Sequence, residues 1–365
     1  MSSTYSLRPK HFNWRYIVLA VALLADVFLW LSALSVFVDP MHHKVAAVAG
    51  LAFPAALLFA AGMFLLTLCL LPRRSWIPLV GILFALPAIR SYCPLNINSA
   101  PSADAIKLIT YNVAGFGEII NDSTSSSPIA DYLVEEQADI VCLQEAVAVS
   151  TETHNKVYAR LQEEYAYTDT IHIQGNVLAL LSRYKILDKH VITGHEFNGA
   201  VRFSVLLAPH DTLTVVNCHF ESNRLNAEER ENYREIVKEH ETDGARHNAL
   251  TLMRKIAVAA GERARQADTV ANFVASLGER SVLLMGDFND TPISYAHRRI
   301  ASTRLCDAYA TAGNGPGRTF NRDAMYVRID HVFASPDWHV VSCKVDRRAS
   351  WSDHYPVVTI VERQR

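Results

Sequence analysis

The stretch Ser281-Val282-Leu283-Leu284-Met285-Gly286-Asp287-Phe288-Asn289 decides the fold, because a short apolar run ends abruptly in an acid and an amide. A run of this length bounded by a Gly-Asp turn predicts a buried strand, with Asp287 and Asn289 at its end. Two later stretches, Arg328-Ile329-Asp330-His331 and Ser352-Asp353-His354, repeat this design beside other apolar runs. Charged groups at the ends of buried strands indicate a functional site rather than a part of the core.

Three predicted strands further upstream end in the same way. They lie at residues 107–112, 139–145 and 214–219, and they end in an amide, an acid and an imidazole. The polar side chains at all these strand ends are Asn112, Glu145, His219, Asp287, Asn289, Asp330, Asp353 and His354. This combination of residue types is typical of a catalytic site.

In type and order, these residues resemble the motifs of the endonuclease/exonuclease/phosphatase superfamily. That group includes pancreatic deoxyribonuclease, apurinic endonucleases, deadenylases, neutral sphingomyelinases and inositol-polyphosphate phosphatases. The matching motifs are Thr110-Tyr111-Asn112, Leu143-Gln144-Glu145, Asn217-Cys218-His219, Gly286-Asp287-Phe288-Asn289, Arg328-Ile329-Asp330-His331 and Ser352-Asp353-His354. Each motif alone is a weak signal, since a Gly-Asp turn or an Asp-His pair is common, but the whole series in this order is specific. The motifs span about residues 105 to 361.

Helical patterns alternate with the predicted strands in this part of the chain. They lie at residues 129–136, 155–164, 226–239 and 249–277. Such alternation predicts an α/β fold. Periodicity alone does not separate a doubly wound single sheet from two packed sheets. The resemblance implies an α/β (α+β) fold of the second kind, a four-layer αββα sandwich of two mixed sheets with the site at one edge.

The longest helical pattern allows two interpretations. Five alanines recur in it at helical spacing, at positions 257, 260, 264, 267 and 271, and Arg254, Arg263 and Arg265 are interleaved with them. We expect a helix that covers a sheet with its alanine face. The alternative is that its arginines line a groove for a phosphodiester substrate.

The first 95 residues differ in composition from the rest and contain three apolar segments, at about residues 16–38, 45–71 and 76–95. At about 1.5 Å per residue, the first two segments can cross a hydrocarbon core of about 30 Å. A secretory signal peptide is the competing interpretation of the first, but its apolar stretch is too long and no small-residue cleavage pattern follows. We expect an N-terminal bundle of three transmembrane helices, a linker at residues 96–104 and a catalytic domain at residues 105–365.

The third segment is the weakest, because Pro78, Pro87 and Arg90 interrupt it. Asp26 in the first segment is costly in lipid, so we expect it to face the other helices or a second copy of the chain.

Basic residues around the apolar segments predict the orientation of this integral membrane protein in the inner or plasma membrane. Arg8, Lys10 and Arg15 precede the first segment and Arg73-Arg74 follow the second, whereas the loop between them has one lysine beside an aspartate. The positive-inside rule then places the N-terminus in the cytoplasm. Three spans put the catalytic domain outside the cytoplasm, and two spans put it inside.

The whole-chain charge does not identify a substrate. The chain has 365 residues, half of them hydrophobic, and a formal net charge of −2. Its length allows one large domain and a smaller unit. A nearly neutral chain lacks the overall basic signature of many nucleic-acid binders, although a local groove can still be positive. The charge therefore neither supports nor excludes a nuclease.

The candidate residues suit a hard divalent cation. Hydrolysis of a phosphoester needs an oxygen nucleophile, neutralisation of charge on the phosphoryl oxygens and help for the leaving group. Carboxylate and amide oxygens suit Mg²⁺, with Mn²⁺ as a substitute. The resemblance implies that Glu145 is the principal metal ligand, assisted by Asn112 and Asp353. The histidines and cysteines show no zinc spacing.

Catalytic roles are implied by the resemblance, residue by residue. Asp287 is implied to orient or deprotonate the attacking water, and Asn289 to hold the phosphate or the nucleophile. His354, paired with Asp330, is implied to contact a phosphoryl oxygen, since a carboxylate fixes the tautomer of an imidazole and keeps it cationic. His219 is implied as a second imidazole on the phosphate.

Further polar residues near the motifs have less certain assignments. The residues implied to bind phosphate are Asn176, His219, Asn289 and His354. Asn217 either caps a turn or belongs to the site, and His331 points to the opposite face of its strand from Asp330, which favours a structural role.

The substrate is left open by the fold, because one fold serves many substrates. We expect a phosphodiesterase of nuclease type. The alternatives are a lipid head-group phosphodiesterase resembling the sphingomyelinases, or a phosphatase. A non-enzymatic binding protein on the same fold is a further alternative, but none of the motif acids or imidazoles is missing. The expected partners are a phosphodiester substrate, in nucleic acid or a phospholipid head group, and the lipid bilayer, with no obligate protein partner.

Overall fold

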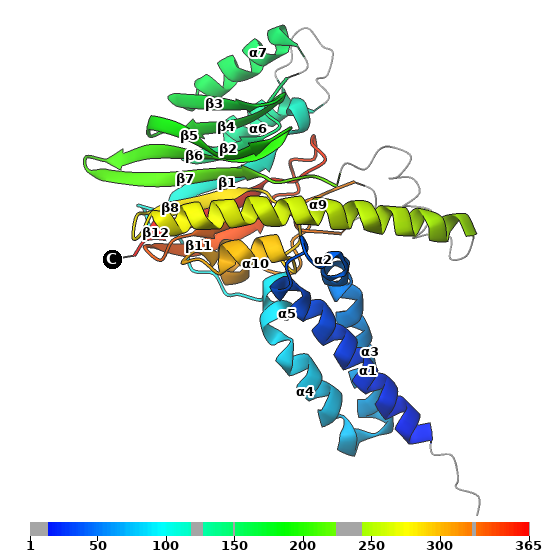
Figure 1. Ribbon diagram of the computed structural model, residues 1–365. Helices are drawn as coiled ribbons and strands as arrows, with labels where there is room; N and C mark the ends of the chain where they lie inside the picture. The colour runs from blue at the N-terminus through cyan, green and yellow to red at the C-terminus, as the bar shows by residue number, and fades with distance from the viewer. Residues whose placement is uncertain (1–13, 118–126, 149, 224–242, 323–325, 365) are drawn as a thin grey trace, which may run out of the picture.

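Two mixed six-stranded sheets pack face to face in the body of the molecule (Figure 1). The computed structural model describes residues 14–117, 127–148, 150–223, 243–322 and 326–364. The first sheet has the order β11 (Trp338–Val345), β12 (Val357–Arg363), β1 (Ile106–Asn112), β2 (Ile140–Gln144), β4 (Asn176–Ser182), β3 (Tyr167–Ile173). The second has the order β5 (Lys185–His195), β6 (Asn198–Ala208), β7 (Asp211–His219), β8 (Val282–Asp287), β10 (Asp330–Ala334), β9 (Cys306–Asp307).

Side-chain alternation along the central strands builds three layers of core. Leu108 and Leu180 of the first sheet meet Val215 and Met285 of the second in the layer between the sheets. Neighbouring strand residues point outward, toward the helices. The strands therefore have hydrophobic side chains on both faces, as their nearly unbroken apolar runs predict.

Helices cover both outer faces. α6 (Pro128–Glu136) and α7 (Thr151–Gln162) pack on the first sheet, and α9 (Asp243–Ser276) and α10 (Tyr295–Ala301) pack on the second. A short α11 (Ala308–Ala312) lies at the end of β9. The four-layer αββα sandwich is confirmed.

The alanine face of α9 is buried, as expected of a sheet-covering helix. All five alanines of the pattern are buried, and Ala267 and Ala271 pack with Val216 and Leu284 of the second sheet. The expected helix at residues 226–239 lies outside the described residues.

An apolar helical bundle projects from the body (Figure 1). Its elements are α1 (Trp14–Leu34), η1 (Ser35–Phe37), α2 (Lys44–Leu51), α3 (Phe53–Leu70), η2 (Pro72–Arg74), α4 (Trp76–Phe84) and α5 (Leu86–Tyr92). Trp14–Phe37 and Phe53–Leu70 are each long and apolar enough to cross a membrane. Pro72–Phe84 and Leu86–Tyr92 form a third candidate span only if the pair, bent by 58°, is counted as one.

The second and third apolar segments are thus less regular than their composition predicts. The second breaks at Ala52 into α2 and α3, and the third bends at Ala85. A proline stands in the first turn of each following helix, at Pro54 and Pro87. Proline has no N–H to donate to the preceding turn, which favours a helix start at these points.

Asp26 faces a neighbouring helix inside the bundle. It is buried, and a Cβ at Gly81 of α4 would lie 2.2 Å from its Cγ. Only glycine leaves room for the carboxyl group at this contact.

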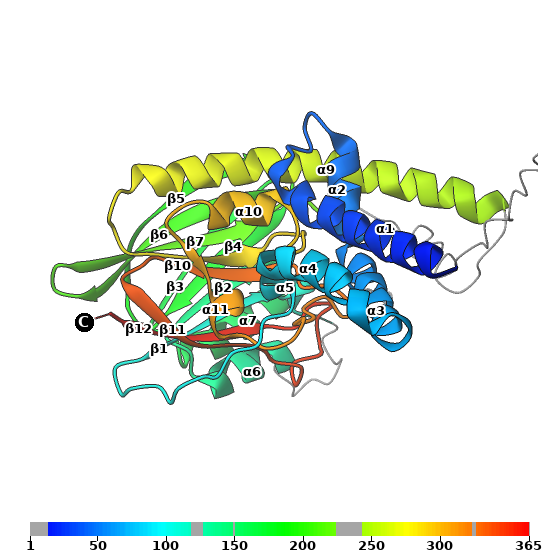
Figure 2. The ribbon, with the colours of Figure 1, turned by 90° about the horizontal axis from the view of Figure 1, so that it is seen from below.

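The body sits at one end of the bundle and the start of α1 at the other (Figures 1 and 2). The Arg74 guanidinium lies 5.6 Å from the ring centroid of Tyr16, so the η2 turn is at the same end as the start of α1. At the other end, Gly261 of α9 lies against Pro40 and Met41 of the loop before α2. We call the end marked by Pro40, Gly50 and Tyr92 the body-facing end.

Candidate active site

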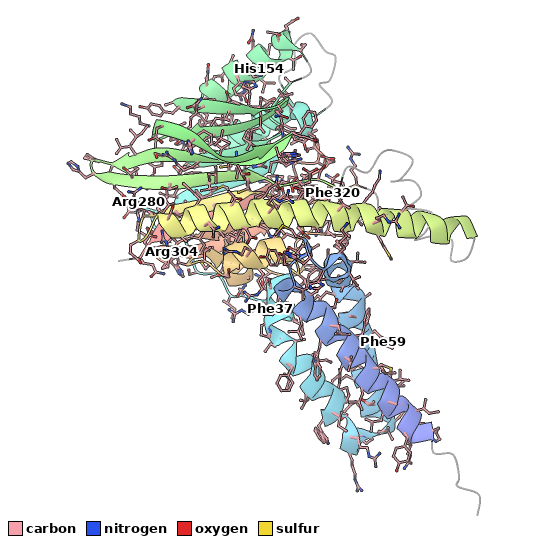
Figure 3. All side chains as sticks on the ribbon, in the orientation of Figure 1. Phe37, Phe59, His154, Arg280, Arg304 and Phe320 are labelled. Carbon is pink, nitrogen blue, oxygen red and sulfur yellow. The ribbon has the colours of Figure 1, made fainter. Side chains whose placement is uncertain are left out.

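Strand pairing brings the predicted residues to one edge of the sandwich. The parallel pair β1 and β2 places Asn112 opposite Gln144, directly before Glu145. In the second sheet, His219 of β7 and Asp330 of β10 both stand opposite Asp287 of β8. Phe320, labelled in Figure 3, marks this edge, since its ring lies 5.3 Å from that of His354.

The Asn112 amide links acids from the two sheets. Its Nδ2 donates to Glu145 Oε1 at 3.0 Å and to Asp287 Oδ2 at 3.0 Å, while its Oδ1 accepts from the backbone N–H of Ala114. The Glu145 side chain is 43% exposed, whereas Asp287 is fully buried. The Glu145 carboxylate is therefore open to solvent, whereas the Asp287 carboxylate is almost fully covered by protein.

Asp287 lies close to two imidazoles. Its Oδ2 is 3.6 Å from His354 Nε2 and 3.8 Å from His219 Nε2. Burial raises the pKa of Asp287 to about 6, although the cationic His354 opposes this shift. A carboxylate that titrates near neutrality can exchange a proton with water during a reaction.

A buried ion pair holds His354. Its Nδ1 contacts Asp330 Oδ2 at 2.8 Å, which leaves Nε2 facing Asp287. Burial disfavours the imidazolium, but the carboxylates of Asp330 and Asp287 outweigh this effect and raise the pKa of His354 to about 10. His354 is therefore a cation at neutral pH.

His219 is oriented by Asn176. Asn176 Nδ2 donates to His219 Nδ1 at 2.7 Å, so the ring proton is assigned to Nε2. This Nε2 is buried, lies 3.5 Å from Glu145 Oε1 and has no hydrogen-bond partner among the described residues. A buried donor of this kind suits an anionic ligand oxygen.

Two site residues have a left-handed backbone that non-glycine residues rarely adopt. Glu145 has φ +53° and Asn289 has φ +51°. Asn289 is held by its backbone N–H, which donates to Asp287 Oδ1 at 2.8 Å, and by its Nδ2, which donates to the Phe220 carbonyl. Such strain is common where side chains are positioned for function.

A pocket of about 560 Å³ opens beside these groups. Glu145, Asn176 and His219 line its polar side. Phe197, which is 56% exposed, lines another side. Sequence reasoning missed Phe197, because a single aromatic residue in a turn carries no periodic signal.

The oxygen ligands present fit a hard divalent cation. Glu145 offers a half-exposed carboxylate at the pocket, and the Asn112 amide is adjacent to it. Asp353 is half-buried, and its Oδ1 lies 3.4 Å from Ser352 Oγ. The metal assignment of Asn112, Glu145 and Asp353 stays a prediction.

A second acidic cluster must be distinguished from this set. Asp287, Asp330 and His354 are the described residues whose ligand atoms lie within 4.8 Å of one another. However, Asp330 Oδ2 and His354 Nδ1 already bond each other. We interpret this cluster as an acid-base network rather than as the ligand set of the metal.

Several other motif residues are structural. Asn217 donates to the carbonyls of Leu143 and Ala179, so it joins the two sheets instead of capping a turn. His331 faces away from Asp330 and its Nε2 contacts the Asp290 carbonyl at 2.9 Å. Thr319, which lies outside the motifs, also has a supporting role, because its Oγ1 accepts from the backbone N–H of Asp330.

Comparison with known proteins agrees with this geometry. A family model described as "Endonuclease/Exonuclease/phosphatase family" matches residues 109–354. A model described as a domain of unknown function matches residues 15–92. Comparison with curated proteins gave no match.

Two similar solved structures show the fold. An endonuclease/exonuclease/phosphatase from Beutenbergia cavernae is 20% identical, with a TM-score of 0.51 over 71% of this chain and 72% of that one. D. rerio TDP2, crystallised with a single strand DNA product, is 16% identical, with a TM-score of 0.50 over 71% of this chain and 99% of that one.

Proposed function

Because the chain belongs to the endonuclease/exonuclease/phosphatase family and is a phosphoester hydrolase, we propose that it is a membrane-anchored, Mg²⁺-dependent phosphodiesterase of nuclease type. The observation that carries the proposal is the buried Asp287 carboxylate, flanked by two imidazole Nε2 atoms and bridged to Glu145 by Asn112. This arrangement supplies a base, a cation and a ligand for a divalent metal at one place.

Each catalytic side chain has a separate role in the proposed hydrolysis. Asp287 orients the attacking water and accepts its proton, while the Asn289 amide helps to hold the phosphate. The cationic His354, fixed by Asp330, donates from Nε2 to a phosphoryl oxygen. His219 donates to another such oxygen from its Nε2, which has no hydrogen-bond partner in the described part of the chain. Hydrogen bonds aimed at the oxygens where charge develops stabilise the transition state more than the ground state.

Glu145, Asn112 and Asp353 are the residues that we propose to hold Mg²⁺. When bound there, the cation neutralises charge on the phosphoryl group and the leaving oxygen. The half-exposed carboxylate leaves room for substrate and water, which Mg²⁺ keeps in its coordination shell.

The pocket favours a substrate with a planar group next to the phosphate. The exposed ring of Phe197 lies on the same pocket as Glu145 and His219. Stacking of a base on an aromatic ring is tolerant of sequence and is worth about 1–3 kcal/mol. This supports nucleic acid as the substrate.

A lipid head-group phosphodiesterase is the second candidate. The observation that favours it is the apolar bundle, whose two or three candidate spans would keep the site near a bilayer. A phosphatase would cleave a terminal phosphate in the same pocket.

A substrate panel with the full-length protein in detergent micelles tests these proposals. The substrates are bis-p-nitrophenyl phosphate, p-nitrophenyl phosphate, plasmid DNA, RNA and sphingomyelin, each with Mg²⁺, Mn²⁺ or EDTA. We expect hydrolysis of nucleic acid with Mg²⁺ and none with EDTA. Turnover of sphingomyelin alone would replace the nuclease proposal by the lipid one, and turnover that persists in EDTA would contradict the metal requirement.

A further inference from the structure

We infer that the body-facing end of the membrane bundle holds two active-site segments in position, so that the packing of the bundle sets the rate of hydrolysis. The inference rests on the hydrolysis proposed above but not on the identity of the substrate. It assigns positioning roles to Gly50 in the bundle and to Arg328 in the body. Neither residue contacts the reacting groups.

The first segment is the chain that follows Asn289. Four residues further on, Ile293 is buried in the hydrophobic cluster of the bundle, with Leu29 and Phe53. Its backbone carbonyl lies so close to α2 that a Cβ at Gly50 would be only 2.3 Å from that oxygen. The loop that follows Asn289 therefore packs directly against the backbone of α2.

The same loop is also held by the body. Arg263 of α9 is buried, and its Nε donates to Asp290 Oδ2 at 2.9 Å. The same guanidinium donates to the Glu221 carbonyl, two residues after His219. The loop thus contacts both α9 and the bundle, so we expect a displacement of α2 to be passed on to the residues that follow Asn289.

The second segment begins at Arg328, two residues before Asp330. Arg328 is 1% exposed. Its guanidinium donates to the carbonyls of Tyr92 and Ser91, at 3.3 and 2.5 Å, and to that of Pro316 at 2.6 Å. The last carbonyls of a helix have no partner within the helix, and here the arginine supplies one for the end of α5.

The ring of Tyr309 packs against the guanidinium of Arg328. The guanidinium carbon lies 4.0 Å from the ring centroid, a distance typical of a cation–π contact. A planar guanidinium with several fixed donors can join α5, the loop at Pro316 and the start of β10 at once. Movement of α5 would therefore displace the start of β10 and with it Asp330, whose carboxylate bonds the ring of His354.

Both contacts act on groups whose geometry matters for the reaction. One supports the loop after Asp287 and Asn289, and the other supports the strand that carries Asp330. A misplacement of about 1 Å far from the chemistry can lower a rate by about 100-fold. The bundle is accordingly a part of the active-site scaffold as well as an anchor.

A matched pair of glycine variants in the full-length protein tests the inference. Gly50→Ala places a methyl group against the Ile293 carbonyl, whereas Gly62→Ala in α3 has open space around the new Cβ. With bis-p-nitrophenyl phosphate as substrate in nanodiscs, we expect Gly50→Ala to lower kcat by about 10- to 100-fold. Its KM should change little, and Gly62→Ala should match the wild type. A folded Gly50→Ala protein with the wild-type kcat would overturn the inference.

Two further measurements cover the cases in which Gly50→Ala does not fold or the wild type hydrolyses nothing. The first measures the kcat of the wild-type protein in nanodiscs whose lipids have increasing acyl-chain length. The substrate is again soluble bis-p-nitrophenyl phosphate, so its binding to the bilayer does not affect the result. We expect kcat to depend on bilayer thickness, because spans adapt to mismatch by tilting.

The second measurement is hydrogen exchange of the peptides that contain residues 287–293 and 328–331. We expect faster exchange in one or both peptides in bilayers of mismatched thickness, and in Gly50→Ala compared with Gly62→Ala. This readout needs no activity, so it separates a failure of the inference from a failure of the proposed function. Equal exchange in all these samples would reject the positioning role.

Discussion

At the residue scale, two buried pairs in the described part of the chain join a histidine to an aspartate by a hydrogen bond, and we expect them to have different roles. His354 and Asp330 lie at the site with atoms 2.8 Å apart, and His297 and Asp307 lie behind it at 3.0 Å. We expect Asp330→Asn to lower kcat by about 10²–10⁴-fold, because His354 loses the carboxylate that keeps it cationic.

The matched control is Asp307→Asn. It removes the same charge from the same kind of pair, and asparagine can still cap α11 as Asp307 does. We expect it to lower the free energy of unfolding by about 1–3 kcal/mol and to leave kcat unchanged. Steady-state kinetics and thermal unfolding of both variants check this contrast, and a wild-type kcat in Asp330→Asn would mean that His354 needs no charge.

The pH dependence of kcat/KM is a second prediction for these residues. The base form of Asp287 is the carboxylate, and burial raises its pKa to about 6, so activity should rise with pH up to about 6. Burial opposes the cationic form of His354, but Asp330 and Asp287 raise its pKa to about 10, so activity should fall only above about pH 10.

Asp330→Asn provides the check on the alkaline side. It removes the largest favourable influence on the His354 cation, so the alkaline limb should move to lower pH. An alkaline limb that stays in place would show that another group controls it.

At the element scale, the β7–β8 pair depends on one glycine. Gly286 stands opposite Cys218 with φ +148°, and a Cβ there would lie 1.9 Å from the Cys218 carbonyl oxygen. We expect Gly286→Ala to lower the free energy of unfolding by more than about 3 kcal/mol, since a backbone clash adds to the strained φ. Gly278→Ala also has a positive φ but no atoms near the new Cβ, and should cost only about 1 kcal/mol. Denaturant unfolding of both variants measures the difference, and similar losses would rule out the clash as the cause.

Local sequence reveals some elements better than others. Strand ends such as Asp287 and Glu145 could be predicted to form one site, because apolar runs that stop at polar residues are local signals. The break at Ala52 is harder to predict, since the residues on both sides are equally apolar and Pro54 is the local signal that marks it. The contacts of Asn217, Phe197 and Arg328 could not be predicted from the sequence either, because each depends on packing between segments far apart in the chain.

At the scale of the whole molecule, the bundle contacts the body at its body-facing end. α2 packs against α9, and Arg298 of α10 lies 4.0 Å from the ring centroid of Phe37 in η1. The Arg73-Arg74 turn and the start of α1 lie at the far end, away from the body. The described basic residues that predict the cytoplasmic side, Arg15 and Arg73-Arg74, are therefore separated from the body by the length of the bundle.

This separation leads to a prediction of orientation. If the bent pair of α4 and α5 serves as a third span, a cytoplasmic N-terminus places the body outside the cytoplasm. We expect protease added to intact spheroplasts to digest the body, while a tag at the N-terminus stays protected until the cells are lysed. Removing the basic charge by replacing Arg73 and Arg74 with glutamine should weaken the preference for this orientation. Protection of the body in intact spheroplasts would instead mean that the pair does not cross, and that the substrate is met in the cytoplasm.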